Sequence, residues 1–263
     1  MDLGLKGKVV LISGGYRGTG AGTAQVLAAE GAKVAVHGFH VAQADEVVSK
    51  ITAVNLDAAS VDGDLTTDAG AKRIIDQTTE AFGPIDILVN NYGAPSKTNW
   101  DTSPDMWLEG WDKNVLSGVR LTQAVIPSMR EKKWGRIVFV GTIGTEKPSN
   151  INPDYYSAKG ALPTLVRSLA KELQGSGVTA NLVSPGMIAT DEVREMVLRR
   201  AAREGIDTWQ EAEKWAVANM MPNLTRRIPT PEDIGRFIAF VASEAAWHLT
   251  AADLKVDGGA VDA

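Results

Sequence analysis

The chain of 263 residues contains no cysteine and only three histidines, His37, His40 and His248. The absence of thiols excludes disulfides, thiolate metal sites, iron–sulfur clusters and cysteine nucleophiles. The histidines are too few and too scattered along the sequence to indicate a zinc site. We therefore expect no metal centre, and any redox chemistry must use a borrowed organic cofactor.

An excess of one charge and long apolar runs are also missing. The chain carries 27 basic and 32 acidic residues, for a net charge of −5, which argues against a general affinity for nucleic acid or anionic membranes. No apolar run approaches the length of a membrane span, and the N-terminus lacks the apolar core of a signal peptide. We expect a cytoplasmic protein that acts on small molecules.

Glycine, by contrast, is abundant. The 26 glycines and the 44% hydrophobic content suit one large α/β domain over residues 1–263. Apolar runs alternate with helical patterns, which is typical of repeated βαβ units and a parallel sheet. The pattern predicts strands at 8–12, 33–37, 58–61, 85–89, 136–140, 178–182 and 254–256, and helices at 18–30, 42–53, 68–82, 114–131, 155–174 and 231–242.

Residues 190–227 are too long for a simple connection and carry helical patterns of their own at 192–203 and 209–221. This segment is a predicted lid over a substrate site. The large apolar residues in or near it either line a pocket for a bulky substrate or pack the lid against the body: Met187, Met196, Trp209, Trp215, Met220 and Met221. Its arginines either steer an anionic substrate or form a solvated helix face: Arg199, Arg200 and Arg203.

The apolar run at 9–12 leads directly into Ser13-Gly14-Gly15-Tyr16-Arg17-Gly18-Thr19-Gly20, and a helical pattern follows. A strand, a glycine-rich turn and a helix in this order are the context of a dinucleotide-binding fingerprint, in which bare backbone approaches a pyrophosphate. An ordinary glycine-rich turn is the alternative that this context disfavours.

The end of the second predicted strand bears on the choice of cofactor. An acidic residue there would bind the 2′-hydroxyl of NAD, and Gly38 supplies none. Arg17, with His37 or His40, could instead donate hydrogen bonds to the 2′-phosphate of NADP. The sequence favours NADP(H); NAD(H) is the alternative if Arg17 points to solvent and the histidines only end the strand.

Tyr155 and Lys159 stand four residues apart, and therefore on one face of a predicted helix. A nearby ammonium would lower the pKa of the phenol by roughly three units toward neutrality, where it could donate and accept protons. Taken alone, the pair could equally be a packed ring and a solvated amine.

The spacing Gly-x-x-x-Gly-x-Gly, with Asn90-Asn91-Tyr92-Gly93, Tyr155-x-x-x-Lys159 and Pro185-Gly186, resembles the short-chain dehydrogenase/reductase family, including its 3-oxoacyl reductases. The resemblance covers nearly the whole chain. It implies a Rossmann-type doubly wound parallel sheet of about seven strands with helices on both faces. It also implies one domain for cofactor and substrate, commonly assembled as a homotetramer. Tyr92 departs from the family, which usually has alanine there.

The resemblance also implies a site. Its catalytic residues are Asn114, Thr142, Tyr155 and Lys159, with Thr142 in place of the usual serine and Asn114 holding a water beside Lys159. Its cofactor-binding residues are Gly14, Arg17, Gly18, Thr19, Gly20, His37, Asp64, Leu65, Asn90, Asn91, Gly93, Tyr155, Lys159, Pro185, Gly186, Ile188 and Thr190. Several have plain alternatives, because Thr142 could simply end a strand, and asparagine, aspartate and threonine often cap helices or turns.

These residues predict an oxidoreductase that interconverts a secondary alcohol and a ketone, with a small carbonyl or alcohol substrate. The alternative is a catalytically silent dinucleotide-binding protein that senses cofactor redox state, motivated by Thr142, Tyr92 and the unusual lid.

Overall fold

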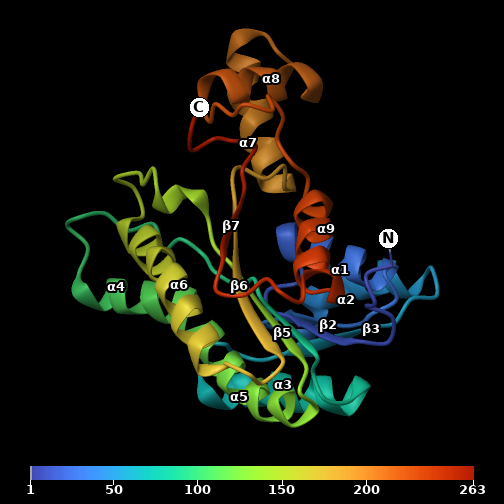
Figure 1. The fold of residues 1–263 in the computed structure, drawn as a ribbon. Coiled ribbons are helices and arrows are strands. Elements are labelled where there is room, and N and C mark those ends of the chain that lie inside the picture. Colours follow the sequence, from blue (N-terminus) through green and yellow to red (C-terminus); the bar gives the residue numbers. More distant parts are fainter. Residues whose placement is uncertain (1) are drawn as a thin grey trace.

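The structure is a computed structural model that describes residues 2–263, and its centre is a seven-stranded parallel sheet (Figure 1). The order along the sheet is β3-β2-β1-β4-β5-β6-β7. The strands are β1 Val9–Ile12, β2 Lys33–Gly38, β3 Ala58–Asp62, β4 Ile87–Asn90, β5 Gly135–Val140, β6 Val178–Pro185 and β7 Asp253–Val256. All seven predicted strands are present, and the Rossmann-type fold is confirmed.

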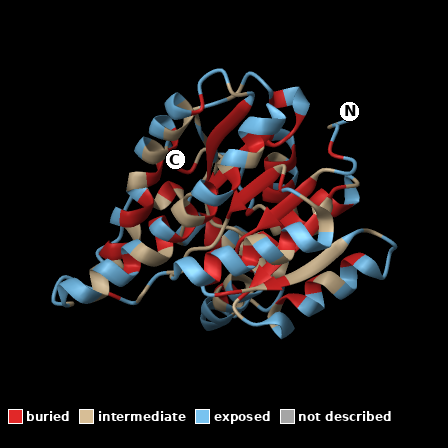
Figure 2. Ribbon diagram, turned by 90° about the horizontal axis from the view of Figure 1, so that it is seen from below, coloured by how far each residue is buried: buried red, intermediate tan, exposed pale blue. Residues whose placement is uncertain are grey.

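Helices cover both faces of this sheet, because alternate strand residues point to opposite sides. In β1, Val10 and Ile12 share an apolar cluster with α1, α2 and α9, whereas Val9 and Leu11 share another with α3, α5 and α6. Figure 2 shows the strands buried between helices with exposed outer faces. The helices are α1 Gly18–Ala29, α2 Val41–Thr52, α3 Asp68–Phe82, α4 Pro104–Trp111, α5 Ser117–Lys132, α6 Pro153–Glu172, α7 Asp191–Ala201, α8 Trp209–Asn219 and α9 Pro231–Val241.

The helix predicted at 114–131 is observed as α5, which begins three residues later, at Ser117. It is preceded by α4 and by a π-helical turn, Asp112–Leu116, in which the N–H of Ser117 bonds to the carbonyl of Asp112. The prediction was wrong here because apolar periodicity does not reveal a change in backbone winding. π turns often occur at functional sites, and this one contains Asn114.

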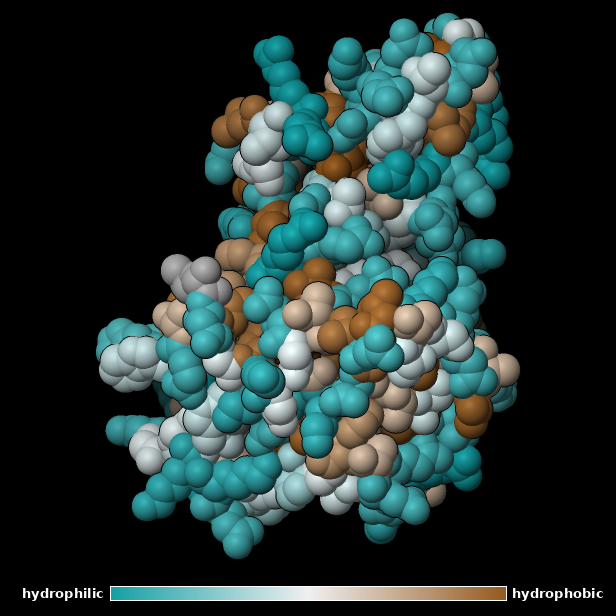
Figure 3. All heavy atoms as spheres, turned by 90° about the vertical axis from the view of Figure 1, so that its right-hand side faces the viewer, coloured by the Kyte–Doolittle hydropathy of each residue, from teal (hydrophilic) through white to brown (hydrophobic). Residues whose placement is uncertain are grey.

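The predicted lid contains α7 and α8, which lie beyond the carboxyl ends of the strands (Figure 1). The two helices pack together around Val197, Ala201 and Ala216. Five of the six large apolar residues weighed above pack against this cluster: Met187, Met196, Trp209, Trp215 and Met220. In the space-filling view of Figure 3, the end of the molecule formed by this segment carries hydrophobic side chains among hydrophilic ones. The packing of the segment therefore accounts for most of its large apolar residues.

The topology fixes where a ligand can bind. Strand β2 pairs with one edge of β1, and β4 pairs with the other edge, so the order of the strands reverses at β1. At such a switch point the carboxyl ends of neighbouring strands open a crevice, where ligands bind in this class of fold. In residues 2–263 no helix has the length and apolarity to cross a membrane, and no cluster of ligating side chains suited to a metal occurs.

Candidate active site

A cleft of about 660 Å³ lies at the carboxyl ends of the strands. It is lined by the glycine loop before α1, by the segments that follow β2, β4, β5 and β6, and by α6 and the start of α7. The predicted site residues that line it are Gly14, Arg17, Gly18, Thr19, Gly20, Asn91, Gly93, Thr142, Tyr155, Lys159, Pro185, Gly186, Ile188 and Thr190. Residues far apart in the sequence are thus brought into one cavity.

The glycine loop has the conformation that its sequence predicts. Gly14 and Gly18 have φ angles of 61° and 51°, a region that favours glycine. At Gly20 a Cβ would lie 2.5 Å from the carbonyl oxygen of Gly14. No side chain caps the start of α1, so its first N–H groups face the cleft as an anion site.

His37 holds the glycine loop in place through its ring nitrogens. It is fully buried; its Nδ1 accepts a hydrogen bond from the N–H of Gly14 at 3.0 Å, and its Nε2 lies 2.9 Å from the carbonyl of Gly63. Burial lowers the pKa of His37, so the ring is neutral and donates through Nε2 to Gly63. Both ring nitrogens are thereby engaged. The expected hydrogen bond from His37 to a 2′-phosphate is not available, because the ring points into the sheet.

The two asparagines after β4 also join segments. Asn91 donates from Nδ2 to the carbonyls of Ser13 and Gly14, both at 3.0 Å, and so ties β4 to the glycine loop. Asn90 is buried beneath the cleft and donates to Thr122 at 3.0 Å. Its place is structural support for the cofactor region, behind the lining residues.

Asp64 and Leu65 lie outside the lining of the cleft. Leu65 is fully buried, and the Asp64 carboxylate accepts hydrogen bonds from the N–H and hydroxyl of Thr66. The sequence analysis expected both to border an adenine. Tyr92 and Phe39 line the cleft at this end, and the expectation for Asp64 and Leu65 stays a prediction.

At the reacting end, Tyr155 and Lys159 share the inner face of α6. Lys159 is buried and donates from Nζ to the carbonyl of Val140 at 2.9 Å. Burial lowers the pKa of Lys159 to about 8 and raises that of Tyr155 to about 12. The lowered tyrosine pKa expected from the sequence is therefore wrong for the protein alone, because burial, and after it the neighbouring Tyr156, disfavour the phenolate. Tyr155 is a neutral phenol, the form that can donate a proton.

Thr142 ends the run after β5 and caps the short turn Ile143–Thr145. Its Oγ1 accepts a hydrogen bond from the N–H of Gly144 at 3.1 Å. A hydroxyl that accepts in this way keeps its own proton free to donate. Thr142 thus presents a donor to the cleft, as a serine would.

Asn114 lies in the π turn behind these groups. Its Nδ2 donates to the carbonyls of Gly110 and Ala94, at 2.8 and 3.0 Å, while its Oδ1 is buried without a partner in the described residues. A Cβ on Gly93 would lie 2.6 Å from Lys159 Nζ and 2.7 Å from this Oδ1. The bare backbone of Gly93 therefore leaves a polar space between them that suits a water molecule.

The segment 190–227 meets the glycine loop at one point. A Cβ on Gly18 would lie 3.3 Å from the Thr190 methyl, and Arg17 forms a 3.2 Å ion pair with Glu192 in the first turn of α7. Glu192 lines the cleft, as do Tyr16, Ala94, Pro95 and Val193. The sequence analysis did not single out these residues as site residues, because their places in the cleft depend on tertiary packing.

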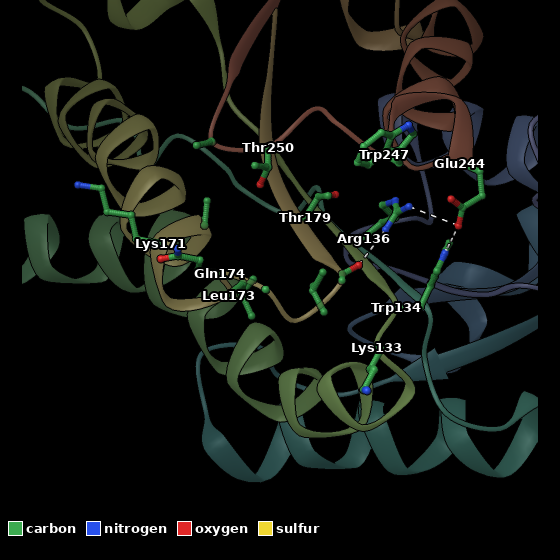
Figure 4. Close-up of a pocket in the computed structure, with 15 residues that line it drawn as sticks. Lys133, Trp134, Arg136, Lys171, Leu173, Gln174, Thr179, Glu244, Trp247 and Thr250 are labelled. Carbon is green, nitrogen blue, oxygen red and sulfur yellow. Dashed lines mark hydrogen bonds and ion pairs between the residues drawn. The ribbon is translucent and has the colours of Figure 1, made fainter.

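A second cavity of about 660 Å³ lies near the opposite ends of β5 and β6. Figure 4 shows its buried Arg136 directed toward Glu244, with Trp134 beside both. The guanidinium donates to the carbonyls of Gly135 and Gly177 and pairs with Glu244 at 3.5 Å. The polar groups of this second cavity largely have hydrogen-bond or ion-pair partners within the protein. The first cleft is therefore the candidate active site.

Comparison with known proteins decides the family. A family model described as "Enoyl-(Acyl carrier protein) reductase" matches residues 14–261. The chain belongs to the short-chain dehydrogenase/reductase family. It is an NAD(P)-dependent oxidoreductase of that family.

Individual relatives agree with this assignment. The chain is 32% identical over 265 residues to an uncharacterised oxidoreductase, YvaG, of Bacillus subtilis, covering 99% of this chain and 98% of the relative. It is 31% identical over 259 residues to D-beta-hydroxybutyrate dehydrogenase of Cupriavidus necator, covering 97% and 98%. Among 3-oxoacyl-[acyl-carrier-protein] reductases, that of Pseudomonas aeruginosa is 29% identical, with 98% of each chain covered.

Two solved structures are close to this one in shape. L-sorbose reductase from Gluconobacter frateurii, complexed with NADPH and L-sorbose, gives a TM-score of 0.91 at 27% identity, with both chains fully covered (100%). A 7 alpha-hydroxysteroid dehydrogenase, complexed with NADH and 7-oxo glycochenodeoxycholic acid, gives 0.84 at 29% identity over 98% of this chain and 96% of that one.

The cleft of this dehydrogenase/reductase fits a nicotinamide dinucleotide. The N–H groups at the start of α1 lack a side-chain cap, and Gly18, Gly20 and Gly93 line the cleft without a side chain. Bare backbone and an open helix start are what a pyrophosphate and its riboses need for close approach.

Proposed function

We propose that the protein is an NADP(H)-dependent oxidoreductase that interconverts a secondary alcohol and a ketone, with Tyr155 as general acid and base. The observation that carries the proposal is that one cleft is lined by the glycine loop at one end and by Thr142, Tyr155 and Lys159 at the other. The bound dinucleotide supplies the hydride, and the protein must position the carbonyl and supply the proton.

The residues divide this work by their geometry. The glycine loop and the start of α1 would hold the pyrophosphate, and Thr190 would lie by the nicotinamide end. Thr142 would donate a hydrogen bond to the carbonyl oxygen, and Tyr155, neutral because it is buried, would deliver its proton to that oxygen. Lys159 holds a proton behind Tyr155, and a water between Lys159 and Asn114 would return protons from solvent. Oxidation of the alcohol is the same path reversed.

The preference for NADP(H) rests on Arg17 and Gly38. Gly38 ends β2 without a carboxylate, and Arg17 stands at the edge of the cleft with its side chain 64% exposed. Its ion pair with Glu192 is a surface pair, worth at most about 1 kcal/mol, so a phosphate dianion can replace the carboxylate. NAD(H) remains the second candidate cofactor.

We also propose that copies of the chain associate as a homotetramer. Four large apolar side chains between residues 100 and 116 are exposed, Trp100 by 74%, Leu108 by 67%, Trp111 by 39% and Leu116 by 38%. We expect another copy of the chain to cover these side chains, because exposed apolar surface is often buried in a protein interface. Light scattering coupled to size-exclusion chromatography measures the assembly directly, and a monomeric mass would contradict this proposal.

The function is tested by initial rates of NADPH and NADH oxidation over a panel of ketones, from small keto esters to bulky cyclic compounds. Tyr155→Phe should lose about 10²- to 10⁴-fold in turnover, the usual contribution of a positioned acid, while still binding NADPH. Tyr156→Phe is the matched control, because its neighbour four residues on is Gly160 rather than a cation. Equal activity of the two variants would contradict the role of Tyr155. Nucleotide binding without turnover of any substrate, in either direction, would favour a redox sensor.

A further inference from the structure

Tyr92 and Phe39 form an aromatic pair at one end of the cleft. Tyr92 follows β4 and Phe39 follows β2, and their ring centroids lie 5.0 Å apart at an interplanar angle of 67°. Both residues line the cleft. The pair therefore closes this end with two large apolar rings.

The position of the pair identifies what would meet it. In doubly wound folds the pyrophosphate lies at the first glycine turn, and the ribose of the adenosine half lies near the end of the second strand. Phe39 directly follows Gly38, the last residue of β2. Tyr155 and Lys159, at the opposite end, belong to the reacting half. The aromatic pair thus stands where an adenosine group would come to lie.

Several contacts hold the pair in place. The N–H of Tyr92 donates to Ser13 Oγ at 3.0 Å, and the N–H of Phe39 donates to Gln43 Oε1 at 2.7 Å. A Cβ on Gly14 would lie 3.2 Å from Tyr92 Cα, so Tyr92 packs directly on the glycine loop. The buried ring of His37 meets Phe39 edge-on, with centroids 5.4 Å apart. The wall is preorganised, which lowers the entropy cost of binding against it.

We infer that Tyr92 and Phe39 form an aromatic wall that binds the adenosine half of the dinucleotide by stacking. This inference rests on the proposed use of an adenine dinucleotide. Asp64 and Leu65 lie outside the cleft lining, and Leu65 is fully buried, whereas Tyr92 and Phe39 line the cleft at this end. A purine ring is flat and stacks well on aromatic side chains. Tyr92 is thus a binding residue for the adenosine half of the nucleotide.

The test measures binding of the two halves separately, by calorimetric titration of the whole protein. The probes are 2′,5′-ADP for the adenosine half and reduced nicotinamide mononucleotide for the other half. Tyr92→Ala and Phe39→Ala should each bind 2′,5′-ADP about tenfold more weakly, as expected for loss of one aromatic stacking partner. Neither variant should change the affinity for the mononucleotide. Tyr92→Phe, which keeps the ring, should bind both probes like the natural protein.

Tyr92→Leu separates stacking from bulk and keeps the test decisive if the alanine variants unfold. Leucine fills similar space without an aromatic face, so it should also weaken binding of 2′,5′-ADP several-fold. Unchanged binding by the leucine variant, or tighter binding by Tyr92→Ala, would overturn the inference. Because binding is measured without turnover, weaker binding of 2′,5′-ADP by these variants would support the aromatic wall even if the protein reduced no ketone. Normal ketone turnover with unchanged binding by Tyr92→Leu would reject the wall alone.

Discussion

The glycine loop at the nucleotide end of the cleft and the reacting end differ in how their buried side chains are partnered. At the glycine loop, both ring nitrogens of His37 and the amide nitrogen of Asn91 make hydrogen bonds that join the loop to β2, β3 and β4. At the reacting end, Asn114 Oδ1 is buried without a partner in the described residues, and Lys159 is a buried cation. The side chains that hold the glycine loop have their partners within the fold, whereas the reacting end keeps a buried oxygen and a buried charge.

This difference has an energetic meaning. Unpaired buried polar atoms and buried charges lower the stability of a protein, and they persist where function requires them. Removing a polar group at the reacting end should therefore cost activity and spare or increase stability. Removing one at the nucleotide end should cost stability first. Four substitutions test this contrast.

Lys159→Met should have the largest effect. Turnover should fall by about 10³-fold, because the variant loses both the cation and the proton source behind Tyr155. Stability should rise. Burial lowers the pKa of Lys159 from 10.5 to about 8, which corresponds to a cost of about 3 kcal/mol for the charged form. The variant also loses the hydrogen bond to the Val140 carbonyl, which offsets about 1 kcal/mol of the gain in stability.

The gain should depend on pH in a defined direction. Between pH 8 and 10.5 the unfolded chain keeps the Lys159 proton that the folded protein has lost, so stability of the natural protein rises with pH in this window. The advantage of Lys159→Met should be greatest below pH 8 and vanish toward pH 10.5. Urea unfolding over this range measures it. A less stable variant at pH 7 would show that Lys159 belongs energetically with the nucleotide end.

Thr142→Val should have the next largest effect. The substitution keeps the shape and removes the hydroxyl that faces the carbonyl oxygen, so turnover should fall by about 10²-fold, as for loss of one donor to a developing oxyanion. Thr142→Ser is the control and should stay within about fivefold of the natural rate, because it keeps the donor and loses only a methyl group. Ketone reduction rates at saturating NADPH measure both. If the valine variant works as well as the serine variant, Thr142 serves only to cap the turn Ile143–Thr145.

His37→Leu should reverse the pattern seen for Lys159. Stability should fall by about 2 to 3 kcal/mol, because the N–H of Gly14 and the carbonyl of Gly63 lose a buried partner. Nucleotide binding should weaken with it, while turnover at saturating nucleotide changes little. Because burial lowers the pKa of His37, the unfolded chain takes up its proton first. The natural protein should therefore lose stability as pH falls below 6.5.

The exposed His248 provides the control for this slope. His248→Leu should lose stability below pH 6.5 as the natural protein does. His37→Leu should lose less, because the contribution of the His37 ring is gone. Denaturant titrations at pH 5 to 7 compare the three proteins. If the stability of His37→Leu falls with pH as steeply as that of the natural protein, another group causes the loss of stability below pH 6.5.

His37 also shows where reasoning from the sequence ends. The strand and glycine turn around it were predicted, because strand-turn-helix order is a local pattern, and the helical spacing of Tyr155 and Lys159 is local too. The direction of the His37 ring depends on its pairing with Gly14 and Gly63, which lie 23 and 26 residues away. The pKa of Tyr155 and the π turn around Asn114 likewise arise from packing, and no periodicity in the sequence encodes them.

Glu192→Gln should have the smallest effect, because it touches neither the buried supports nor the reacting groups. The ion pair with Arg17 is 58% to 64% exposed and restrains Arg17 by less than about 1 kcal/mol. Freed from this pair, Arg17 should receive a 2′-phosphate more readily. The KM for NADPH should fall by about two- to fivefold, while the KM for NADH, which has no 2′-phosphate, should stay unchanged.

Asp191→Asn is the matched control, since Asp191 is the preceding acidic residue of α7 and has no ion pair in residues 2–263. It should leave both Michaelis constants unchanged, apart from a weak long-range effect that salt screens. A fall in the KM for both nucleotides with Glu192→Gln would mean that the pair restrains the lid rather than Arg17. In that case the start of α7 would control access to both ends of the cleft, and it would have to be treated as a third region beside them.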